Sequence, residues 1–384
     1  MKKVQIGFIG AGDFISAQHL LTVRDSRIMD IRAIADLDEQ RLESHASAME
    51  VGYTTTDYKE VLGDPKVDLV IIGTKQNLHA RFIVESLDAG KWILCEKPMS
   101  ETDEETQAVL AAEQRNSGKL AIGFNRRFAP AYAETKRLMQ SVKRPWYVNY
   151  RLMAPNPGKQ TEDSFYKGRP RILYEGCHIL DLVCWLLDSA PRRMFMTGDT
   201  CQNNCCILEY PDDSQVSFMC GSMGSFCHWK EYMEVFGVYT SISINDFVDM
   251  RVRGFEGQFD RVFPPHMGEH AEAVRKYGFD FYEAYKTAEV YQHRDLWAKH
   301  GMAIEQVQRP VAVGFDVREY GPVNPDVGTF GSDKGWIPSV EHFAACYLNG
   351  DEPRNADGKA GALSTSVAMA LIQSMETGHP VEMK

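Results

Sequence analysis

The first 125 residues alternate short, continuous apolar runs with charged, amphipathic segments. The apolar runs are VQIGFIG (4–10), IRAIAD (31–36), VDLVIIGT (67–74), WILCE (92–96) and LAIGFN (120–125). Helix-like segments such as DEQRLESHASAM and DEETQAVLAAEQRN lie between them. Apolar strands that alternate with helices are typical of βαβ units, in which helices cover both faces of a parallel sheet. The pattern predicts a doubly wound Rossmann sheet, whose ligands gather at the carboxyl ends of the strands.

After residue 145 the pattern changes to longer β-type segments. They are WYVNYRLM, CCILEY, QVSFMCGSM, YMEVFGV and SISIND. The turn-forming PDDS at 211–214 separates two of them and predicts a hairpin. The pattern therefore predicts a second α/β domain with a large, open and mainly antiparallel sheet.

A chain of 384 residues exceeds what one hydrophobic core usually organises. We expect a dinucleotide-binding domain at 1–125 and a second domain for substrate binding and oligomerisation at 126–384. Residues 247–335 include the helix-like DFYEAYKTAEVYQHRDLWAKHGMAIEQV between flanks rich in Gly, Pro and aromatic residues. We interpret this stretch as an elaborated insertion in the second domain.

Composition narrows the classes of partner. The net charge of −11 would repel a nucleic-acid backbone or an anionic membrane surface. The N-terminus lacks the apolar stretch of a signal peptide, and no apolar run has membrane-spanning length. The nine cysteines are scattered and odd in number, and CQNNCC (201–206) lacks zinc-site spacing. We therefore expect a cytoplasmic protein with reduced thiols and no metal site.

The turn after the first apolar run favours a dinucleotide site. Gly10 would permit a tight turn, and Gly12 would let the backbone approach a pyrophosphate at a helix N-terminus. Ile15 stands where the usual fingerprint has its third glycine. Asp36 ends the next run, 24 residues after Gly12, near the spacing of a carboxylate that binds the adenosine ribose. The alternative for Asp36 is a helix N-cap before LDEQRL.

Five motifs occur in order: GFIGAGDF (7–14), IIGTKQNLHA (71–80), CEKP (95–98), GFNRRFAPAY (123–132) and EGCHILDLVCWLL (175–187). In sequence and spacing they resemble the glucose-fructose oxidoreductase, inositol dehydrogenase and MocA family of NAD(P)-dependent sugar and cyclitol oxidoreductases. The similarity continues through EVFGVYTSISIND and GWIPSVEHFAACYLNGDEP, so that only 247–335 looks peculiar to this chain.

The resemblance implies a cofactor site and a lysine that acts at the reacting carbon. Lys97 of the EKP motif would lie beside the nicotinamide and bind the substrate oxygen, and Pro98 would follow it in a cis peptide that aims the lysine. The alternative is a surface Glu–Lys pair at a strand end. The resemblance assigns the cofactor to Gly10, Gly12, Asp13, Phe14, Asp36, Thr74, Asn77, His79, Glu96 and Lys97.

The last motif would carry the proton-transfer group. His178 and Asp181 share a helix face if the segment is helical, and a histidine near a carboxylate suits acid-base work near neutral pH. The resemblance makes His178 the proton carrier and gives Asp181 a supporting or sugar-binding role. A buried structural His–Asp pair is the alternative.

The resemblance also suggests which residues contact the substrate. Many family members have aspartate where this chain has Tyr174, and a subgroup has the Glu-x-Cys-His pattern found here. Arg126 and Arg127 could equally be interdomain salt-bridge partners. The substrate-binding candidates are Arg126, Arg127, Tyr150, Tyr174, Glu175 and His178.

We expect an enzyme that transfers a hydride between nicotinamide and a carbinol carbon of a sugar, cyclitol or sugar derivative. NAD is expected rather than NADP, because Asp36 would repel the 2′-phosphate and Leu37, Asp38 and Glu39 offer no compensating cation. Two alternatives remain: redox-neutral, NAD-dependent elimination or glycoside cleavage, and a non-catalytic NAD or sugar sensor. The expected partners are a sugar or polyol and further copies of the chain, in a homodimer or homotetramer formed through the C-terminal sheet.

Overall fold

The chain divides into two compact units. The computed structural model describes residues 2–116, 118–154, 170–199, 201–224, 228–264, 269–292 and 332–383. Unit 1 comprises Met1–Phe128 and Gly335–Ser366, and unit 2 comprises Ala129–Lys334 and Val367–Lys384. The division after Phe128 lies three residues beyond the expected boundary at 125.

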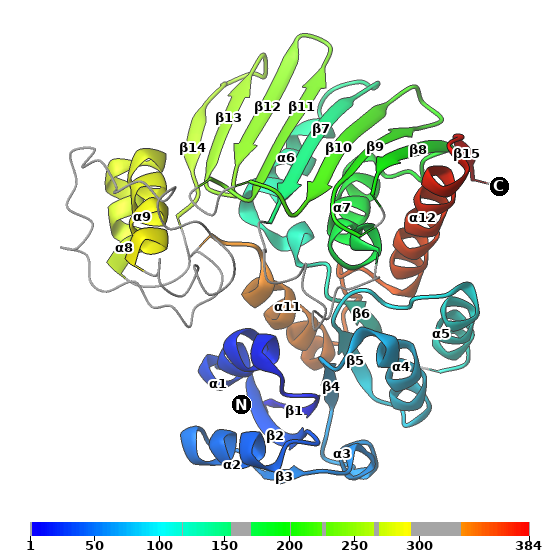
Figure 1. Ribbon diagram of the computed structural model, residues 1–384. Coiled ribbons are helices and arrows are strands. Elements are labelled where there is room, and N and C mark those ends of the chain that lie inside the picture. The colour runs from blue at the N-terminus through cyan, green and yellow to red at the C-terminus, as the bar shows by residue number, and fades with distance from the viewer. Residues whose placement is uncertain are drawn as a thin grey trace. The chain divides into compact units, whose positions relative to one another are not determined.

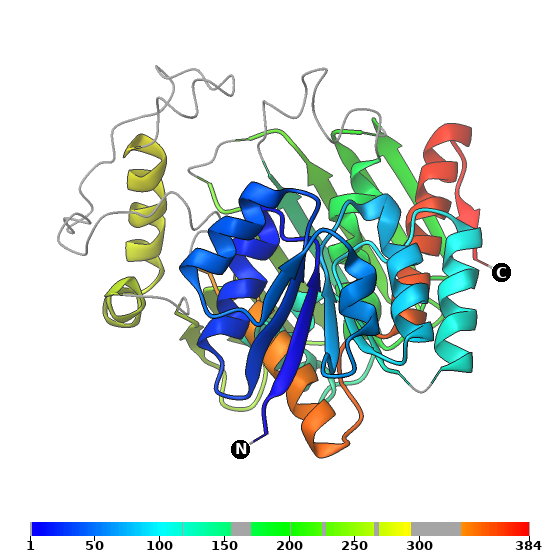
Figure 2. The same cartoon turned by 90° about the horizontal axis from the view of Figure 1, so that it is seen from below.

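Unit 1 is built on a six-stranded parallel sheet, which confirms the Rossmann prediction. Its strand order is β3-β2-β1-β4-β5-β6. Successive strands are added on one side of β1 up to β3 and on the other side from β4 onward, so the order changes direction between β1 and β4. Figure 2 shows these strands side by side. The strands are β1 (Val4–Ile9), β2 (Met29–Ala35), β3 (Tyr53–Thr55), β4 (Leu69–Ile72), β5 (Trp92–Cys95) and β6 (Leu120–Ile122). The expected runs account for all of them except the short, half-buried β3.

Helices follow the strands of unit 1, and those that lie between two strands make the crossovers that a parallel sheet requires. They are η1 (Ile15–Leu20), α1 (Leu21–Asp25), α2 (Glu39–Ala48), α3 (Tyr58–Gly63), η2 (Gln76–Leu78), α4 (His79–Asp88), α5 (Asp103–Arg115) and η3 (Asn125–Phe128). Both α2 and α5 begin at side-chain caps: Asp38 accepts from the Arg41 N–H and Thr102 from the Glu105 N–H.

Helix α11 (Trp336–Asn349) corrects the expected domain assignment. The sequence pattern predicts one second domain from residue 126 to 384, but α11 belongs to unit 1. Its Val340, Phe343 and Ala344 are buried in the same apolar cluster as Phe8 of the central strand. The Phe343 ring lies 5.2 Å from that of Trp92. Apolar pairing between residues some 250 positions apart decides the assignment, and no local pattern reports it.

Unit 2 contains a nine-stranded sheet of order β14-β13-β12-β11-β7-β10-β9-β8-β15 (Figure 1). All neighbours are antiparallel except β7 and β10, which confirms the expected mainly antiparallel sheet. The strands are β7 (Tyr147–Met153), β8 (Arg193–Gly198), β9 (Asn204–Glu209), β10 (Gln215–Gly221), β11 (Glu231–Gly237), β12 (Thr240–Asn245), β13 (Asp249–Arg253), β14 (Asp260–Val262) and β15 (Val381–Glu382).

The expected hairpin joins β9 to β10. Tyr210 donates its N–H to Ser214 O, and Asp213 adopts a left-handed φ of 65°, a conformation that aspartate tolerates in turns. Strands β8, β13, β14 and β15 were not anticipated. β14 and β15 have three residues and two residues, too few to show alternation.

The helices of unit 2 are α6 (Pro130–Met139), η5 (Ile172–Gly176), α7 (Cys177–Leu187), α8 (Glu269–Tyr277) and α9 (Phe279–Gln292). Helix α12 (Gly358–Thr377) crosses the division between the units at Ser366. The helical expectation for 280–307 is met through Gln292, and the rest of that segment lies outside the described residues. In the described ranges, no helix has the length and apolarity to span a bilayer.

Candidate functional site

The expected cofactor residues of unit 1 follow the carboxyl ends of four parallel strands. The glycine turn follows β1, Asp36 follows β2, Thr74 and Asn77 follow β4, and Glu96 and Lys97 follow β5. Since β1, β2, β4 and β5 are parallel neighbours, their carboxyl ends meet at one edge of the sheet. The sequence motifs are therefore gathered where such a sheet binds its ligands.

Gly10 and Gly73 let the ends of β1 and β4 approach closely. Gly10 has a φ of +86°, and a Cβ there would lie 2.8 Å from Gly73 O. A Cβ on Gly73 would lie 2.0 Å from Cγ1 of Ile15. The close packing that the third fingerprint glycine usually permits is therefore obtained by a glycine on the neighbouring strand, which leaves space for Ile15.

Gly12 has a different environment. Apart from its neighbours in the chain, no atom of the described residues lies within 4 Å of the position that a Cβ on Gly12 would occupy, and the following Asp13 and Phe14 are exposed. A helix begins directly after Gly12, at Asp13. The backbone N–H groups of a helix N-terminus that has open space beside it suit a pyrophosphate.

Asp36 is fixed behind the glycine turn. Its Oδ2 accepts the Ala11 N–H at 2.7 Å, and its Oδ1 accepts the Asp38 N–H at 3.0 Å. The N-cap alternative for Asp36 is excluded, because Asp38 caps α2. The Asp36 side chain keeps 12% of its surface exposed and retains lone pairs for ribose hydroxyls.

Arg41 corrects the expectation that no cation lies near Asp36. Its Nη1 is 3.4 Å from Asp36 Oδ1, and its Nη2 is 3.8 Å from Asp38 Oδ2. The expectation rested on residues 37–39, whereas the first turn of α2 returns Arg41 to the end of β2. The two carboxylates outnumber the guanidinium, so the local charge remains negative.

Glu96 is buried and holds two hydrogen-bond donors. Its Oε1 lies 2.7 Å from Nε2 of His19, and its Oε2 accepts the Lys97 N–H at 3.3 Å. Desolvation raises the pKa of this carboxyl, but the hydrogen bond from His19 and the nearby Lys97 charge are among the influences that outweigh it, so the pKa is lowered overall. Gly123 leaves the necessary room, because a Cβ there would lie 2.8 Å from Oε1.

His79 holds the other side of the EKP motif. Its buried ring nitrogens lie 2.8 Å from Pro98 O and 3.2 Å from Thr74 O. Burial lowers the pKa of His79 more than these carbonyls and Glu96 raise it. The side chain thus links the segments after β4 and β5 through their backbones, and a cofactor contact by His79 stays a prediction. The Lys97–Pro98 peptide is cis, as expected.

In unit 2, His178 and Asp181 lie three residues apart on α7, which confirms that their segment is helical. The side chains are buried, with His178 7% and Asp181 3% exposed. Tyr174, which is buried, and Glu175 precede them in the π-helical turn η5. The Glu175 carboxylate pairs with Lys230 at 2.5 Å, a partner that sequence spacing could not indicate.

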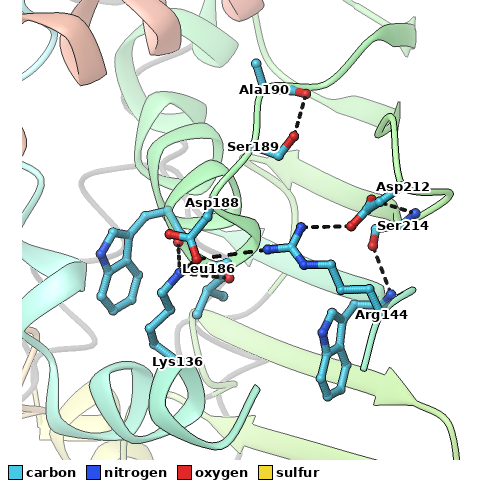
Figure 3. A network of polar contacts seen from close by, with 10 residues as sticks. Lys136, Arg144, Leu186, Asp188, Ser189, Ala190, Asp212 and Ser214 are labelled. Atoms are coloured by element: carbon cyan, nitrogen blue, oxygen red, sulfur yellow. Dashed lines mark hydrogen bonds and ion pairs between the residues drawn. The ribbon is translucent and has the colours of Figure 1, made fainter. Parts of the chain in front are cut away.

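The C-terminal end of α7 is anchored by the polar network of Figure 3. Lys136 of α6 donates to the carbonyl oxygens of Trp185 and Leu186 at 2.6 and 3.2 Å and pairs with Asp188. Arg144 links Asp188 to Asp212 in the β9–β10 turn. A cation at the last helical carbonyls also stabilises the helix dipole. The helix that carries His178 is therefore fixed to both α6 and the sheet.

The structure gives Tyr150 two buried protein partners. Its hydroxyl lies 2.8 Å from the Tyr132 hydroxyl and donates to Glu231 Oε2 at 2.6 Å. The next residue, Arg151, faces the opposite side of the sheet, over the rings of Trp229 and Tyr232. Substrate contact by Tyr150 stays a prediction.

The two arginines of the NRRF segment lie in η3, at the end of the first part of unit 1. Arg126 is buried and Arg127 half-buried. Sequence reasoning missed His19, Arg41 and Lys230, whose partners are 77, 5 and 55 positions away. An i to i+5 relation at a helix start could have indicated Arg41, but no sequence signal indicates the other two.

Residues of unit 1 fit a dinucleotide, on the evidence of the open space at Gly12 and the fixed Asp36 carboxylate. Across the described ranges, no group of three or more His, Cys, Asp or Glu could hold a metal ion. The eight cysteines within those ranges are free thiols.

Comparison with known proteins agrees with this geometry. Residues 4–124 match the GFO_IDH_MocA family model, described as an oxidoreductase family with an NAD-binding Rossmann fold. The chain is 36% identical over 197 residues to the uncharacterized oxidoreductase YrbE of Bacillus subtilis, covering 51% of this chain and 58% of the relative. It is 31% identical over 193 residues to inositol 2-dehydrogenase 2 of Saccharopolyspora erythraea, covering 48% and 54%. The chain thus spans somewhat over half the length of these relatives.

Solved structures share the fold over both units. An oxidoreductase domain protein of Kribbella flavida matches with a TM-score of 0.74 at 18% identity, covering 100% of both chains. A putative myo-inositol dehydrogenase of Sinorhizobium meliloti gives 0.71 at 18%, also with full coverage. An Agrobacterium radiobacter oxidoreductase, solved with NAD⁺, L-tartaric acid and magnesium, gives 0.71 at 14%, covering 99% and 98%. At these identities the matches show the fold alone.

The two fingerprint glycines should respond differently to substitution by alanine. Gly12→Ala should leave the melting temperature unchanged, since no atom meets the new Cβ, but should weaken NAD binding roughly 10- to 100-fold by filling the space in front of the turn. Gly10→Ala should lower the melting temperature, because it meets both a left-handed φ and Gly73 O. Calorimetric titration with NAD and thermal melts of both variants measure this. Unchanged NAD affinity in Gly12→Ala would place the dinucleotide elsewhere.

Proposed function

We propose that the protein is an NAD-dependent dehydrogenase, because residues 4–124 match the GFO_IDH_MocA model of an oxidoreductase family with an NAD-binding Rossmann fold. Its substrate is a sugar, cyclitol or sugar derivative, oxidised reversibly at a carbinol carbon. The observation that carries the proposal is the position of the adjacent residues Glu96 and Lys97. They follow β5 at the same sheet edge as the glycine turn and Asp36, and buried histidines hold them from both sides.

In this proposal NAD, when bound, accepts the hydride that leaves the carbinol carbon. The hydroxyl proton of the same carbon passes to the protein, so the products are a carbonyl compound, the reduced cofactor and a proton. Gly10, Gly12 and Asp36 hold the dinucleotide, and Lys97 and His178 handle the hydroxyl proton.

The surroundings of Lys97 and His178 suggest different roles for them. Lys97 adjoins the Glu96 carboxylate, whose attraction stabilises an ammonium. It is therefore suited to donate a hydrogen bond to the substrate oxygen. His178, with Asp181 on the same face of α7, is suited to accept the proton.

A panel of polyols and sugars, assayed for NADH formation at 340 nm, tests the proposed function. At least one cyclitol, sugar or sugar derivative should support turnover with NAD. Net conversion of a sugar without added NAD, and without NADH accumulation, would instead favour a redox-neutral cycle. Absence of any conversion over the panel would contradict the proposal.

Two variants separate chemistry from folding in that assay. Lys97→Met and His178→Asn should each lower kcat roughly 10²- to 10⁴-fold, the range for a lost acid-base group, while keeping NAD affinity near that of the wild type. A purely structural His178 would give a lower melting temperature and a nearly unchanged kcat per folded molecule.

The environment of Asp36 supports NAD over NADP, with Arg41 as the residue that limits the preference. The like charge of Asp36 should give NAD an advantage in kcat/KM on the order of 100-fold. Asp36→Ser should shift the preference toward NADP, because it releases Arg41 toward the 2′-phosphate. In the double variant Asp36→Ser/Arg41→Ala that shift should vanish. Wild-type kcat/KM with NADP equal to that with NAD would overturn the assignment.

We also propose that the nine-stranded sheet mediates self-association. Alternate residues such as Val148, Phe218 and Val235 are buried on one face. The opposite face exposes large apolar side chains from four adjacent strands. They are Tyr147, Ile207, Met219 and Phe236, each 43–50% exposed.

Met219→Asp, on β10 between the strands of Tyr147 and Ile207, should lower the association state measured by light scattering after gel filtration. Leu37→Asp, at an 89% exposed apolar position in unit 1, is the matched control and should leave the state unchanged. A wild-type monomer at micromolar concentration would refute association through this sheet.

A further inference from the structure

His19 makes a buried contact that the proposed reaction does not yet explain. It lies in η1, is 2% exposed, and places Nε2 at 2.7 Å from Glu96 Oε1. Its other ring nitrogen, Nδ1, is buried and has no hydrogen-bond partner among the residues that the structure describes. A proton on Nδ1 would therefore lack an acceptor, so the geometry favours the tautomer that donates from Nε2 to Glu96.

With that proton, both oxygens of the Glu96 carboxylate are engaged. Oε1 accepts from His19 inside unit 1, and Oε2 accepts from the Lys97 backbone N–H at 3.3 Å. A charged group hydrogen-bonded at both oxygens has one orientation. The backbone at Lys97 is therefore linked through Glu96 to the helix that follows the glycine turn.

The imidazole is itself held in place. The Phe14 ring meets it edge-on at 5.5 Å, and the Trp336 ring lies 5.7 Å from Phe14. The π-helical turn at Ile15–Leu20 sets the direction of the His19 side chain, which a regular α-helix would rotate differently. On the far side of Lys97, His79 binds the Pro98 carbonyl at 2.8 Å. Lys97 thus lies between two residues that buried histidines hold.

We propose that His19 is a positioning residue for Lys97, acting through the buried Glu96 carboxylate. The proposal rests on the proposed function for the role of Lys97, but not for the existence of the His19–Glu96 coupling. The hydrogen bonds that keep Glu96 charged and oriented would keep the lysine aligned with the reacting carbon. A misplacement of about 1 Å at such a position can lower turnover roughly 100-fold.

The coupling also predicts an effect on pH dependence. The titratable groups around Glu96 are His19 on η1, His79 on α4, and Lys97 and Cys95 on its own segment. His19 is among those that lower the pKa of Glu96, so its removal should raise that pKa, because desolvation is the largest single influence. A carboxylate with a lowered pKa contributes stability that is lost as the pH falls through its folded-state value. Without His19 this loss should begin at a higher pH.

Two substitutions of His19 separate hydrogen bonding from packing. His19→Leu fills the space without a donor, whereas His19→Gln can place an amide N–H near the position of Nε2. The Glu96 carboxyl carbon, followed by 13C NMR of the apo-protein and assigned with Glu96→Gln, should titrate at higher pH in His19→Leu and return toward wild type in His19→Gln. An identical titration in His19→Leu and wild type would overturn the proposal.

Kinetics on the substrate found in the panel give the second readout. His19→Leu should lower kcat roughly 10- to 100-fold and move the acid limb of its pH profile to higher pH, and His19→Gln should recover most of the loss. His45→Asn is the control: His45 lies 3.0 Å from Ser16 Oγ, near the same helix, and its loss should leave kcat unchanged. A lowered melting temperature with unchanged kcat and acid limb would make His19 structural only.

The same two experiments also cover a His19→Leu variant that does not fold and a wild type that is inactive. Should His19→Leu not fold, His19→Asn replaces it, because its amide is too short to reach Glu96 Oε1 and must then differ from His19→Gln in the NMR titration. A wild type that converts no substrate would refute the proposed function, while the apo-protein titration would still confirm or refute the coupling.

Discussion

The close approach of the β1 and β4 ends governs how the edge of the unit 1 sheet is built. Gly10 and Gly73 have no side chains because each would meet the other segment or Ile15 at 2.0–2.8 Å. With that contact made, Gly10 turns the chain after β1 with a φ of 86°, and the helical segment that carries His19 follows. A bulkier residue at Gly73 would displace Ile15, which anchors that helix in the core. The helix start, the Asp36 contact and the position of His19 therefore all depend on this packing.

Buried charge is the second organising element in both units. Glu96 of unit 1 and Glu231 of unit 2 are 7% and 0% exposed, and an unpaired carboxylate in such a place would be strongly unfavourable. Each accepts a short hydrogen bond, Glu96 from an imidazole and Glu231 from a tyrosine hydroxyl. Such bonds fix the orientation of the side chains involved more tightly than apolar packing would. The buried carboxylates therefore contribute more to the fixed orientation of these side chains than to the stability of the fold.

Sequence reasoning recovered what depends on local pattern. The apolar runs located five of the six parallel strands, and the PDDS turn located the β9–β10 hairpin. The order of the motifs predicted that Gly10, Asp36 and Lys97 belong to one site, although the sequence does not show that their strands are neighbours. It could not assign α11 to unit 1, because Phe343 is buried against residues near position 92 and no periodicity encodes such a partner. His19 was missed for the same reason, since its partner is 77 positions away.

Irregular helical turns are a further feature of the site that could not be predicted from the sequence. Two π-helical turns occur in the described chain beside candidate site residues: η1 contains His19, and η5 contains Tyr174 and Glu175. A π-helical turn lacks the regular i to i+4 hydrogen bonds of an α-helix. It is therefore found mainly where the function needs the side-chain orientation that the turn produces. Hydrophobic periodicity averages over such a turn and predicts an ordinary helix. In both units the π-helical turn directly precedes a regular α-helix. The α-helix can therefore pack normally, while the side chains in the turn before it point in a direction that a regular helix would not give them. The divergence between pattern and structure therefore falls at the residues whose orientation the proposed chemistry requires.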